Sequence, residues 1–237
     1  MLIALEGVDG AGKSTQVGLL VDRLEQEGLA TYRATFPRYA DPVFGDLIRR
    51  FLNGDLGAVD AIDPRLVALL FANDRAGAAP RLREAICEER IVVCDRYFYS
   101  NLAYQAAKLK DESEADEFAR WLRMLEFDHY ALPVPACSLF LDVHESERSE
   151  RLLARVQAGA EGNGAIANDI HERDIDLQAR VDRLFRSYSQ TREDLVRVDC
   201  QPSGELLSPA DVHSLVWGEL SARGLLASCA DRASLSA

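Results

Sequence analysis

Apolar residues along the chain gather in short unbroken runs, which alternate with longer segments of helical spacing. Unbroken runs predict strands buried on both faces, since a strand with one wet face alternates apolar and polar positions. In the first longer segment, Val17, Leu20, Val21 and Leu24 recur on one helical face. The predicted strands are 2–6, 29–35, 91–94, 137–142 and 195–198. The predicted helices are 13–27, 41–52, 63–79 with 81–89, 97–108, 114–126, 145–154, 172–192 and 208–223.

Strands separated by helices predict an α/β fold, in which a parallel sheet is covered by helices on both faces. Ligands of such sheets gather at the carboxyl ends of the strands. The 237 residues suit one domain, which we expect to span 1–224. The Ala/Ser-rich residues 225–237 are expected to form a flexible tail, and the Gly-rich segment 157–168 is expected to be mobile.

Charge and cysteine content narrow the possible partners. The chain has 27 Lys and Arg against 39 Asp and Glu, so its formal charge is −12. This charge disfavours a nucleic-acid polymer but leaves room for a small phosphate ligand in a local basic pocket. Five scattered cysteines without a C-x-x-C pair predict free thiols in a reducing cytoplasm. No apolar run reaches 18 residues and no basic segment precedes the first strand, so we expect neither a membrane helix nor a signal peptide.

The first strand is followed by a sequence that matches G-x-x-x-x-G-K-[ST]. Glycines let successive amides turn inward around phosphate oxygens, and the next helix points its positive end at the anion. A lysine adds a point charge, and a hydroxyl can bind Mg²⁺. An ordinary glycine-rich turn is the alternative, which the position between a strand and a helix disfavours. The predicted ATP-binding residues are Gly7, Val8, Asp9, Gly10, Ala11, Gly12, Lys13, Ser14 and Thr15.

Polar residues at the end of the strand 91–94 have the chemistry of a phosphate site. Asp95 and Arg96 follow this strand directly, and arginine suits bidentate contact with phosphate. A structural ion pair is the alternative. Phe71 and Arg75 lie four residues apart, hence on one helical face, where a ring can stack on a pyrimidine and a guanidinium can donate to a carbonyl.

Together with the phosphate loop, several segments resemble the thymidylate kinase family, above all in its actinobacterial form. They are LEGVDGAGKST, FPRY, FANDRAGA and DRYFYSNLAYQ in this order, followed later by HERDIDLQAR. The resemblance implies a three-layer P-loop NTPase fold with a five-stranded parallel sheet in the order 2-3-1-4-5 and a mobile lid at about 146–172. It also implies a homodimer, ATP and Mg²⁺ as cofactors, and phosphoryl transfer from ATP to dTMP.

The resemblance also implies roles for individual residues. Asn101 offers the donor and acceptor that the thymine edge needs, and Tyr104 would pack under the sugar. The implied dTMP-binding residues are Asp9, Phe36, Pro37, Tyr39, Phe71, Arg75, Asp95, Arg96, Asn101, Tyr104 and Gln105. The implied catalytic residues are Lys13, Arg96 and Asp9, together with an arginine of the lid. The implied metal ligands are Ser14, Asp9, Glu172 and Asp169.

The lid departs from the family pattern. Thymidylate kinases carry a transfer-assisting arginine either in the phosphate loop or in the lid, and here the loop has Gly10 at the variable position. Residues 156–171 contain neither Lys nor Arg. We therefore expect Arg155 with Arg151, which share a helical face, to supply this charge. Arg148 lies a further turn back, and the alternative is that all three are solvated.

Two other functions compete with a monophosphate kinase. A deoxynucleoside kinase would need a carboxylate base, for which Asp9 or Glu6 are candidates, although FPRY suits an acceptor phosphate better. A nucleotide-binding module without efficient transfer is the second alternative, favoured only by the arginine-poor lid. A guanine-specific switch is disfavoured, because the chain has no Asn-Lys-x-Asp signature.

Overall fold

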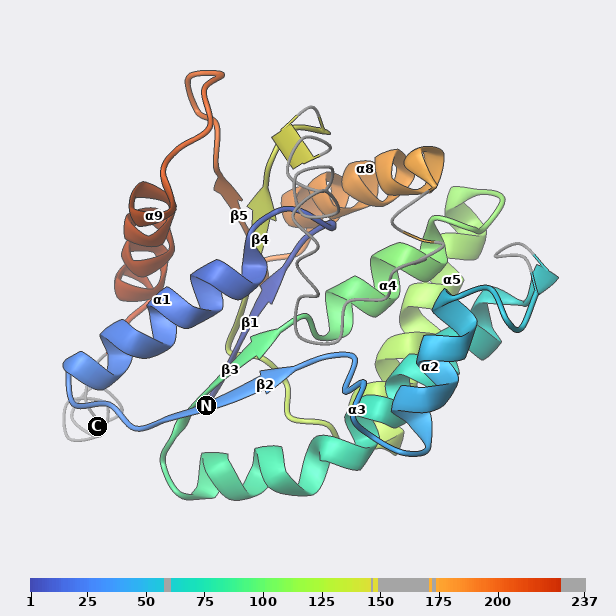
Figure 1. Cartoon of the computed structure of the whole chain (residues 1–237), viewed down its shortest axis with the longest axis horizontal. Coiled ribbons are helices and arrows are strands. Elements are labelled where there is room, and N and C mark those ends of the chain that lie inside the picture. Colours follow the sequence, from blue (N-terminus) through green and yellow to red (C-terminus); the bar gives the residue numbers. More distant parts are fainter. Residues whose placement is uncertain (58–60, 146, 149–170, 172–173, 227–237) are drawn as a thin grey trace.

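The computed structural model describes residues 1–57, 61–145, 147–148, 171 and 174–226. Its centre is one parallel sheet with the strand order β2-β3-β1-β4-β5, which confirms the predicted order (Figure 1). The strands are β1 (Leu2–Glu6), β2 (Thr31–Thr35), β3 (Ile91–Asp95), β4 (Cys137–Asp142) and β5 (Leu195–Asp199). The register pairs Leu5 of β1 with Asp95 of β3 and with Leu139 of β4, so these strands end at one common edge.

Helices cover both faces of the sheet. Helices α1 and α9 lie on one face, and α3, α4, α5 and α8 lie on the other (Figure 1). The helices are α1 (Lys13–Gln26), α2 (Phe44–Leu52), α3 (Pro64–Cys87), α4 (Phe98–Ala106), α5 (Glu112–Arg123), α8 (Ile175–Thr191) and α9 (Pro209–Ala222), with a π-helix η2 (Met124–His129) directly after α5. The predicted three-layer α/β fold is therefore confirmed.

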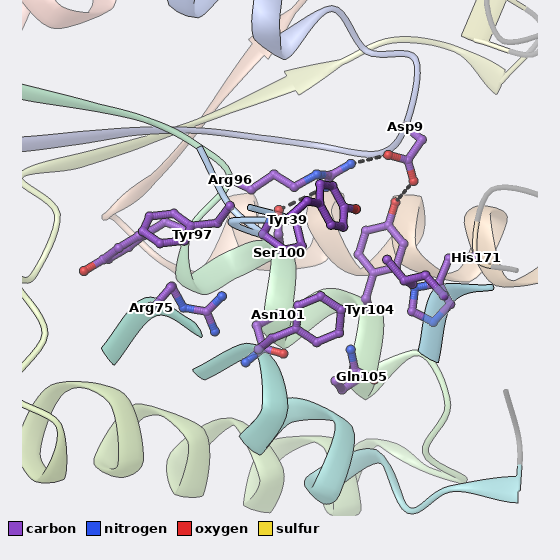
Figure 2. Close-up of a pocket in the computed structure, with 14 residues that line it drawn as sticks. Asp9, Tyr39, Arg75, Arg96, Tyr97, Ser100, Asn101, Tyr104, Gln105 and His171 are labelled. Atoms are coloured by element: carbon purple, nitrogen blue, oxygen red, sulfur yellow. Dashed lines mark hydrogen bonds and ion pairs between the residues drawn. The ribbon is translucent and has the colours of Figure 1, made fainter. Parts of the chain in front are cut away.

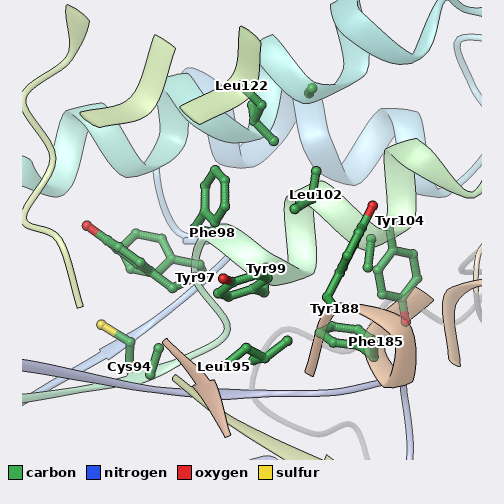
Figure 3. Packing of buried hydrophobic residues seen from close by; sticks show 14 of the residues in the cluster. Cys94, Tyr97, Phe98, Tyr99, Leu102, Tyr104, Leu122, Phe185, Tyr188 and Leu195 are labelled. Carbon is green, nitrogen blue, oxygen red and sulfur yellow. The ribbon is translucent and has the colours of Figure 1, made fainter. Parts of the chain in front are cut away.

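The core explains the unbroken apolar runs. Along β1, Leu2 and Ala4 pack in the cluster under α4 and α8, whereas Ile3 and Leu5 pack in the cluster under α1 and α9. Since successive side chains of a strand point to opposite faces, both faces demand apolar residues. The first cluster is rich in aromatic rings from α4 and α8, as Figure 3 shows.

Some boundaries differ from the prediction for local reasons. The helix expected from residue 41 begins at Phe44, because the Asp41 carboxylate accepts the amides of Val43 at 3.0 Å and Phe44 at 2.8 Å and so fixes a turn. Helix α3 runs without a break through Pro80. The segment expected as one helix over 114–126 changes to π-helical geometry at Met124.

Several predicted segments fall outside the described residues. They are most of the helix 145–154, the Gly-rich segment 157–168, the first residues of the helix 172–192 and the tail from 227. In the part of the chain that the structure describes, no helix combines the length and apolar character that a bilayer crossing requires.

Candidate active site

The loop between β1 and α1 has the backbone geometry of a phosphate cradle. Gly7, Gly10 and Gly12 all have positive φ angles, of 139°, 81° and 87°. A Cβ atom on Gly7 would lie 3.0 Å from the carbonyl oxygen of Leu141, and one on Gly10 would lie 3.1 Å from that of Arg148. The loop therefore needs glycine at these positions for its conformation and for space.

Lys13 begins α1 and is folded back over the loop. Its Nζ donates to the carbonyl oxygen of Val8 at 2.8 Å, and the side chain is buried. Burial, helped by the nearby Arg96 charge, lowers the pKa of Lys13 to about 8. A triphosphate bound in the loop would place a negatively charged partner next to this ammonium group.

The side chains of Ser14 and Asp95 bring two kinds of oxygen atom together beside the loop. The Ser14 hydroxyl donates to the Asp95 carboxylate at 2.6 Å, although the two residues come from α1 and β3. Hydroxyl and carboxylate oxygens are ligands that Mg²⁺ prefers. In the described part of the chain, no group of three or more His, Cys, Asp or Glu side chains is placed to hold a metal ion.

Arg96 connects the phosphate loop to the neighbouring helix. Its Nη1 donates to the carbonyl oxygen of Gly7 at 2.9 Å and to the Ser100 hydroxyl at 3.2 Å, and its Nη2 pairs with Asp9 (Figure 2). Its φ angle of 64° is unusual for a residue with a Cβ atom. Although burial lowers the pKa of Arg96, the surrounding acidic groups, with Asp9 foremost, together outweigh this effect and raise the pKa.

Asp9 is the acceptor at the centre of this network. Besides Arg96, it accepts the Tyr104 hydroxyl at 2.5 Å and the Gln178 amide at 3.0 Å. Burial alone would raise the pKa of Asp9, but the charges of Arg96 and Lys13 outweigh it and lower the pKa well below its usual range. Asp9 is therefore an ionised anchor that joins the loop, α4 and α8.

A second carboxylate, Glu6, holds the turn after β3. It is fully buried and accepts the amides of Tyr97 at 3.1 Å and Tyr99 at 3.0 Å, and the Ser100 hydroxyl at 2.5 Å. Burial raises its pKa. These bonds fix the start of α4 and hence the position of Arg96.

A pocket opens next to this network, between the FPRY loop, α3 and α4 (Figure 2). Ten of the eleven residues that the resemblance implied for dTMP line it together. They are Asp9, Phe36, Pro37, Tyr39, Phe71, Arg75, Arg96, Asn101, Tyr104 and Gln105. The eleventh, Asp95, lies against Ser14 and not on the wall. Sequence reasoning missed Leu52, Tyr97, Ser100 and His171, which also line the pocket.

The FPRY loop is tied to α3 by its arginine. Arg38 donates from its backbone amide and its Nε to the Asp74 carboxylate, at 2.9 and 3.0 Å, and from Nη2 to the Asp74 carbonyl oxygen at 2.7 Å. The peptide bond between Phe36 and Pro37 is cis. Arg38 thus points away from the pocket, while its neighbours Pro37 and Tyr39 line it.

Helices α3 and α4 form one wall of the pocket. Two side chains of this wall are held by a carboxylate that no sequence motif indicated. Arg75 donates to Glu126 of η2 through Nε at 2.8 Å and Nη2 at 2.5 Å. Asn101 donates to the same carboxylate at 3.0 Å. Burial lowers the pKa of Arg75, but the charge and hydrogen bonding of Glu126, together with the Asp74 charge, outweigh this effect and raise the pKa.

His171 lines the pocket next to Tyr104. Its ring lies 5.5 Å from the rings of Tyr104 and Phe51, and its Nε2 is 3.0 Å from Nζ of Lys108. Burial, with the Lys108 charge, lowers the pKa of His171 to about 3, so the ring is neutral. His171 is the first residue of the segment HERDIDLQAR, which resembles the family. This position in the segment is the signal in the sequence that could have identified His171 as a site residue.

The predicted lid residues Arg151, Arg155, Asp169 and Glu172 lie outside the described residues. Arg148 is described and buried, and its backbone and Cβ lie against Gly10 of the phosphate loop. Its Nη1 is 4.0 Å from the Asp182 carboxylate. Of the three candidate arginines, Arg148 alone is among the described residues, and it lies next to the loop.

The fold and the loop define a P-loop nucleotide-binding protein with a second pocket beside the phosphate cradle, which is the layout of a small-molecule kinase. A model of the thymidylate kinase family matches residues 5–209. The chain belongs to this family.

Individual relatives agree with that assignment. A thymidylate kinase of Mycobacterium tuberculosis is 36% identical over 220 residues, which cover 90% of this chain and 100% of the relative. A probable thymidylate kinase of Thermococcus gammatolerans is 31% identical over 92% of this chain and 94% of its own length. Among solved structures, a thymidylate kinase of Candida albicans superposes with a TM-score of 0.70 and 22% identity, covering 95% and 93% of the two chains, which shows the shared fold.

Proposed function

We propose that this chain transfers the γ-phosphoryl group of ATP to dTMP, which gives ADP and dTDP. The observation that carries the proposal is the Arg96–Asp9 pair, since it belongs to the phosphate loop and to the pocket at once. A nucleotide phosphate that binds Arg96 from the pocket would lie next to the end of a triphosphate in the loop. This is the arrangement that in-line transfer between two phosphates requires.

The donor half of the site is the loop of residues 7–15 with the N-terminus of α1. Its inward-turned amides and the positive end of the helix would hold the ATP phosphates. Lys13 would leave the Val8 carbonyl oxygen to contact the β- and γ-phosphates. Lys13 and Arg96 would then stabilise the negative charge of the group in transfer, and no protein nucleophile is needed, because the acceptor is itself an anionic oxygen.

The acceptor half is the pocket. Tyr39 and Arg96 would bind the dTMP phosphate, and Phe71, Arg75 and Asn101 would bind the base. Tyr104 would pack beside the sugar, with its hydroxyl held by Asp9. Asp9 would thereby fix the sugar side of the pocket relative to the phosphate loop.

Ser14 and Asp95 fit Mg²⁺, because their oxygens lie together at the loop, 2.6 Å apart. The Asp9 oxygens accept from Arg96, Tyr104 and Gln178, so we assign Asp9 chiefly to positioning. When bound, Mg²⁺ would neutralise charge on the β- and γ-phosphates. Asp169 and Glu172 stay candidate ligands, and Arg151 and Arg155 stay candidate sources of lid charge, with Arg148 added to them because of its contact with Gly10.

A deoxynucleoside kinase is the weaker candidate, because it needs a carboxylate that can remove a proton from a sugar hydroxyl. The pKa of Asp9 is lowered by Arg96 and Lys13, which makes it a poor base. Glu6 is fully buried and occupied by the turn after β3.

The test is a coupled ADP-release assay with ATP, Mg²⁺ and separate acceptors: dTMP, dUMP, dCMP, AMP and thymidine. We expect dTMP to give the highest kcat/KM. A preference for thymidine would support the deoxynucleoside kinase, and ATP hydrolysis that no acceptor accelerates would support a nucleotide-binding module.

We further propose a homodimer that acts in the cytoplasm. The dimer is supported by the family and by exposed apolar side chains on neighbouring helices, namely Val43 and Leu47 near α2 and Leu66 on α3. The scattered cysteines support a reducing compartment. Light scattering across a hundredfold range of protein concentration tests the dimer, and a constant monomer mass would contradict it.

A further inference from the structure

Glu126 joins the two residues that we assign to the base. It lies on the π-helix η2, its side chain is 0% exposed, and it takes both Arg75 of α3 and Asn101 of α4 as donors. The Oε1 atom accepts from Arg75 Nη2 and from Asn101 Nδ2, and the Oε2 atom accepts from Arg75 Nε. One buried carboxylate therefore fixes two side chains from different helices.

This contact decides which way the Asn101 amide points. Its Nδ2 donates to Glu126 and to the carbonyl oxygen of Ala68, each at 3.0 Å. The reversed amide would set Oδ1 against two acceptors and leave both of them without a donor, so only one orientation is favourable. In that orientation Oδ1 is buried and accepts no hydrogen bond from any described residue.

An unmet buried acceptor is costly, and a ligand that donates to it removes the cost. Asn101 lines the pocket, so a base that binds there comes close to this amide. Arg75 also lines the pocket. It donates to Glu126 through Nε and Nη2, so its Nη1 group is not used in this contact. The wall thus offers a donor from Arg75 beside an acceptor from Asn101.

This donor–acceptor pair matches one kind of pyrimidine edge. Thymine and uracil present a carbonyl oxygen at position 4 beside an N–H at position 3. Cytosine presents an amino group beside an unprotonated ring nitrogen, so both contacts would be mismatched. A site built to bond a polar edge rejects a mismatched edge strongly, because its own buried groups are left unpaired.

We infer that Glu126 is the positioning residue for base selection, because it holds Arg75 and the Asn101 amide in the arrangement that accepts a carbonyl next to a ring N–H. Glu126 does not contact the nucleotide itself. This inference rests on the proposed function. Replacing Glu126 by glutamine puts an amide NH₂ group in place of one carboxylate oxygen. If the remaining oxygen lies at the Oε1 position, Arg75 Nε faces a donor; if it lies at the Oε2 position, Arg75 Nη2 and Asn101 Nδ2 face one.

The first experiment uses the unmodified protein and 3-methyl-dTMP, which lacks the N–H at position 3. We expect its kcat/KM to be at least ~100-fold below that of dTMP, whereas dUMP, which keeps this N–H, should be affected far less. Equal use of dTMP and 3-methyl-dTMP would overturn the assigned Asn101 orientation while dTMP kinase activity stands. Failure of the proposed function would be recognised separately, as no transfer to any of these acceptors.

The second experiment compares Glu126→Gln and Glu126→Asp with Glu117→Gln, an exposed glutamate of α5 as the matched control. We expect both Glu126 variants to reduce the dTMP/dCMP ratio of kcat/KM at least ~10-fold, with KM for ATP changed less than twofold. Glu126→Asp keeps the charge, so a purely charge-neutralising role would leave its ratio intact. An unchanged ratio in Glu126→Asp, with the fold verified by circular dichroism, would overturn the inference.

Discussion

Two cations beside the phosphate loop differ in how firmly they keep their charge. Arg96 is paired with Asp9, and this carboxylate raises its pKa. Lys13 has only the Val8 carbonyl oxygen as its partner for a hydrogen bond among the described residues, and burial lowers its pKa to about 8. Arg96 is thus a fixed part of the site, whereas the full charge of Lys13 depends on a bound phosphate.

Replacing Lys13 by methionine should nearly abolish transfer while the fold survives. We expect kcat to fall by ~10³-fold, because a preorganised charge on the moving phosphoryl group is lost. The free energy of unfolding should hold or rise slightly, because a buried charge is removed. The measurements are the coupled assay and urea unfolding, and turnover near the original value would refute the role of Lys13.

ATP affinity should weaken above pH 8. The charged form of Lys13 binds phosphate, and above a pKa of about 8 its population in the free protein falls tenfold per pH unit. The Kd for ATP at pH 9 should therefore be roughly tenfold above that at pH 7. Calorimetric titration measures this. Lys13→Arg, whose guanidinium stays charged, is the control and should show a flat profile; the same slope in both proteins would contradict the assignment.

Among the connecting segments, the loop of residues 36–39 depends on α3 for its shape. Arg38 reaches across the helix to Asp74, and Gly77, one turn further on, leaves the space that the guanidinium needs. A Cβ atom on Gly77 would lie 2.6 Å from Nη2 of Arg38. The acceptor side of the pocket therefore relies on a residue that does not line it.

Gly77→Ala should displace Arg38 and so raise KM for dTMP roughly tenfold, the value of about one charged hydrogen bond, with KM for ATP unchanged. The control is Gly18→Ala in α1, where an added Cβ meets nothing within 4 Å. That variant should gain about 0.5–1 kcal/mol of stability at unchanged KM. Steady-state kinetics for both substrates decide the matter, and an equal rise of both KM values in Gly77→Ala would count against a loop-specific effect.

At the scale of the whole molecule, stability rests on two buried layers, one on each face of the sheet. The layer under α4 and α8 is rich in aromatic rings, and the layer under α1 and α9 is mainly aliphatic. In the layer under α8, Phe185 stacks on Phe140 of β4 with ring centroids 4.9 Å apart and an interplanar angle of 10°. The active site lies at the edge of this layer, since Tyr104 belongs to the cluster and also to the pocket.

Phe185→Ala should lower the free energy of unfolding by about 3–5 kcal/mol, because a fully buried ring is deleted from a packed core. Leu215→Ala on α9 is the control, since this side chain is 40% exposed, and it should cost less than about 1 kcal/mol. Urea unfolding followed by circular dichroism measures both, and similar losses would show that the two layers are not the main source of stability.

Much of this architecture could be predicted from the sequence. The buried strands are readable because both of their faces are apolar, and the phosphate loop is readable because its glycines and Lys13 are local in sequence. Ten pocket residues are predictable because they sit in short sequence motifs.

The rest depends on contacts that no local pattern records. Glu126 meets Arg75 across 51 positions of sequence, and it lies in a π-helix that replaces the expected end of an α-helix. The family resemblance predicts Asp95, the last residue of β3, as a pocket residue, but its partner is Ser14, 81 positions away. Such pairings follow from the packing of helices on the sheet, which fixes distances that sequence spacing leaves open.

The most direct test of the central claim is a crystal structure with dTMP and a non-hydrolysable ATP analogue bound together. We predict the triphosphate across residues 7–15, the dTMP phosphate on Arg96, and the thymine ring between α3 and α4 at Arg75 and Asn101. A thymine ring bound elsewhere, or a pocket without any nucleotide at saturating dTMP, would contradict the account.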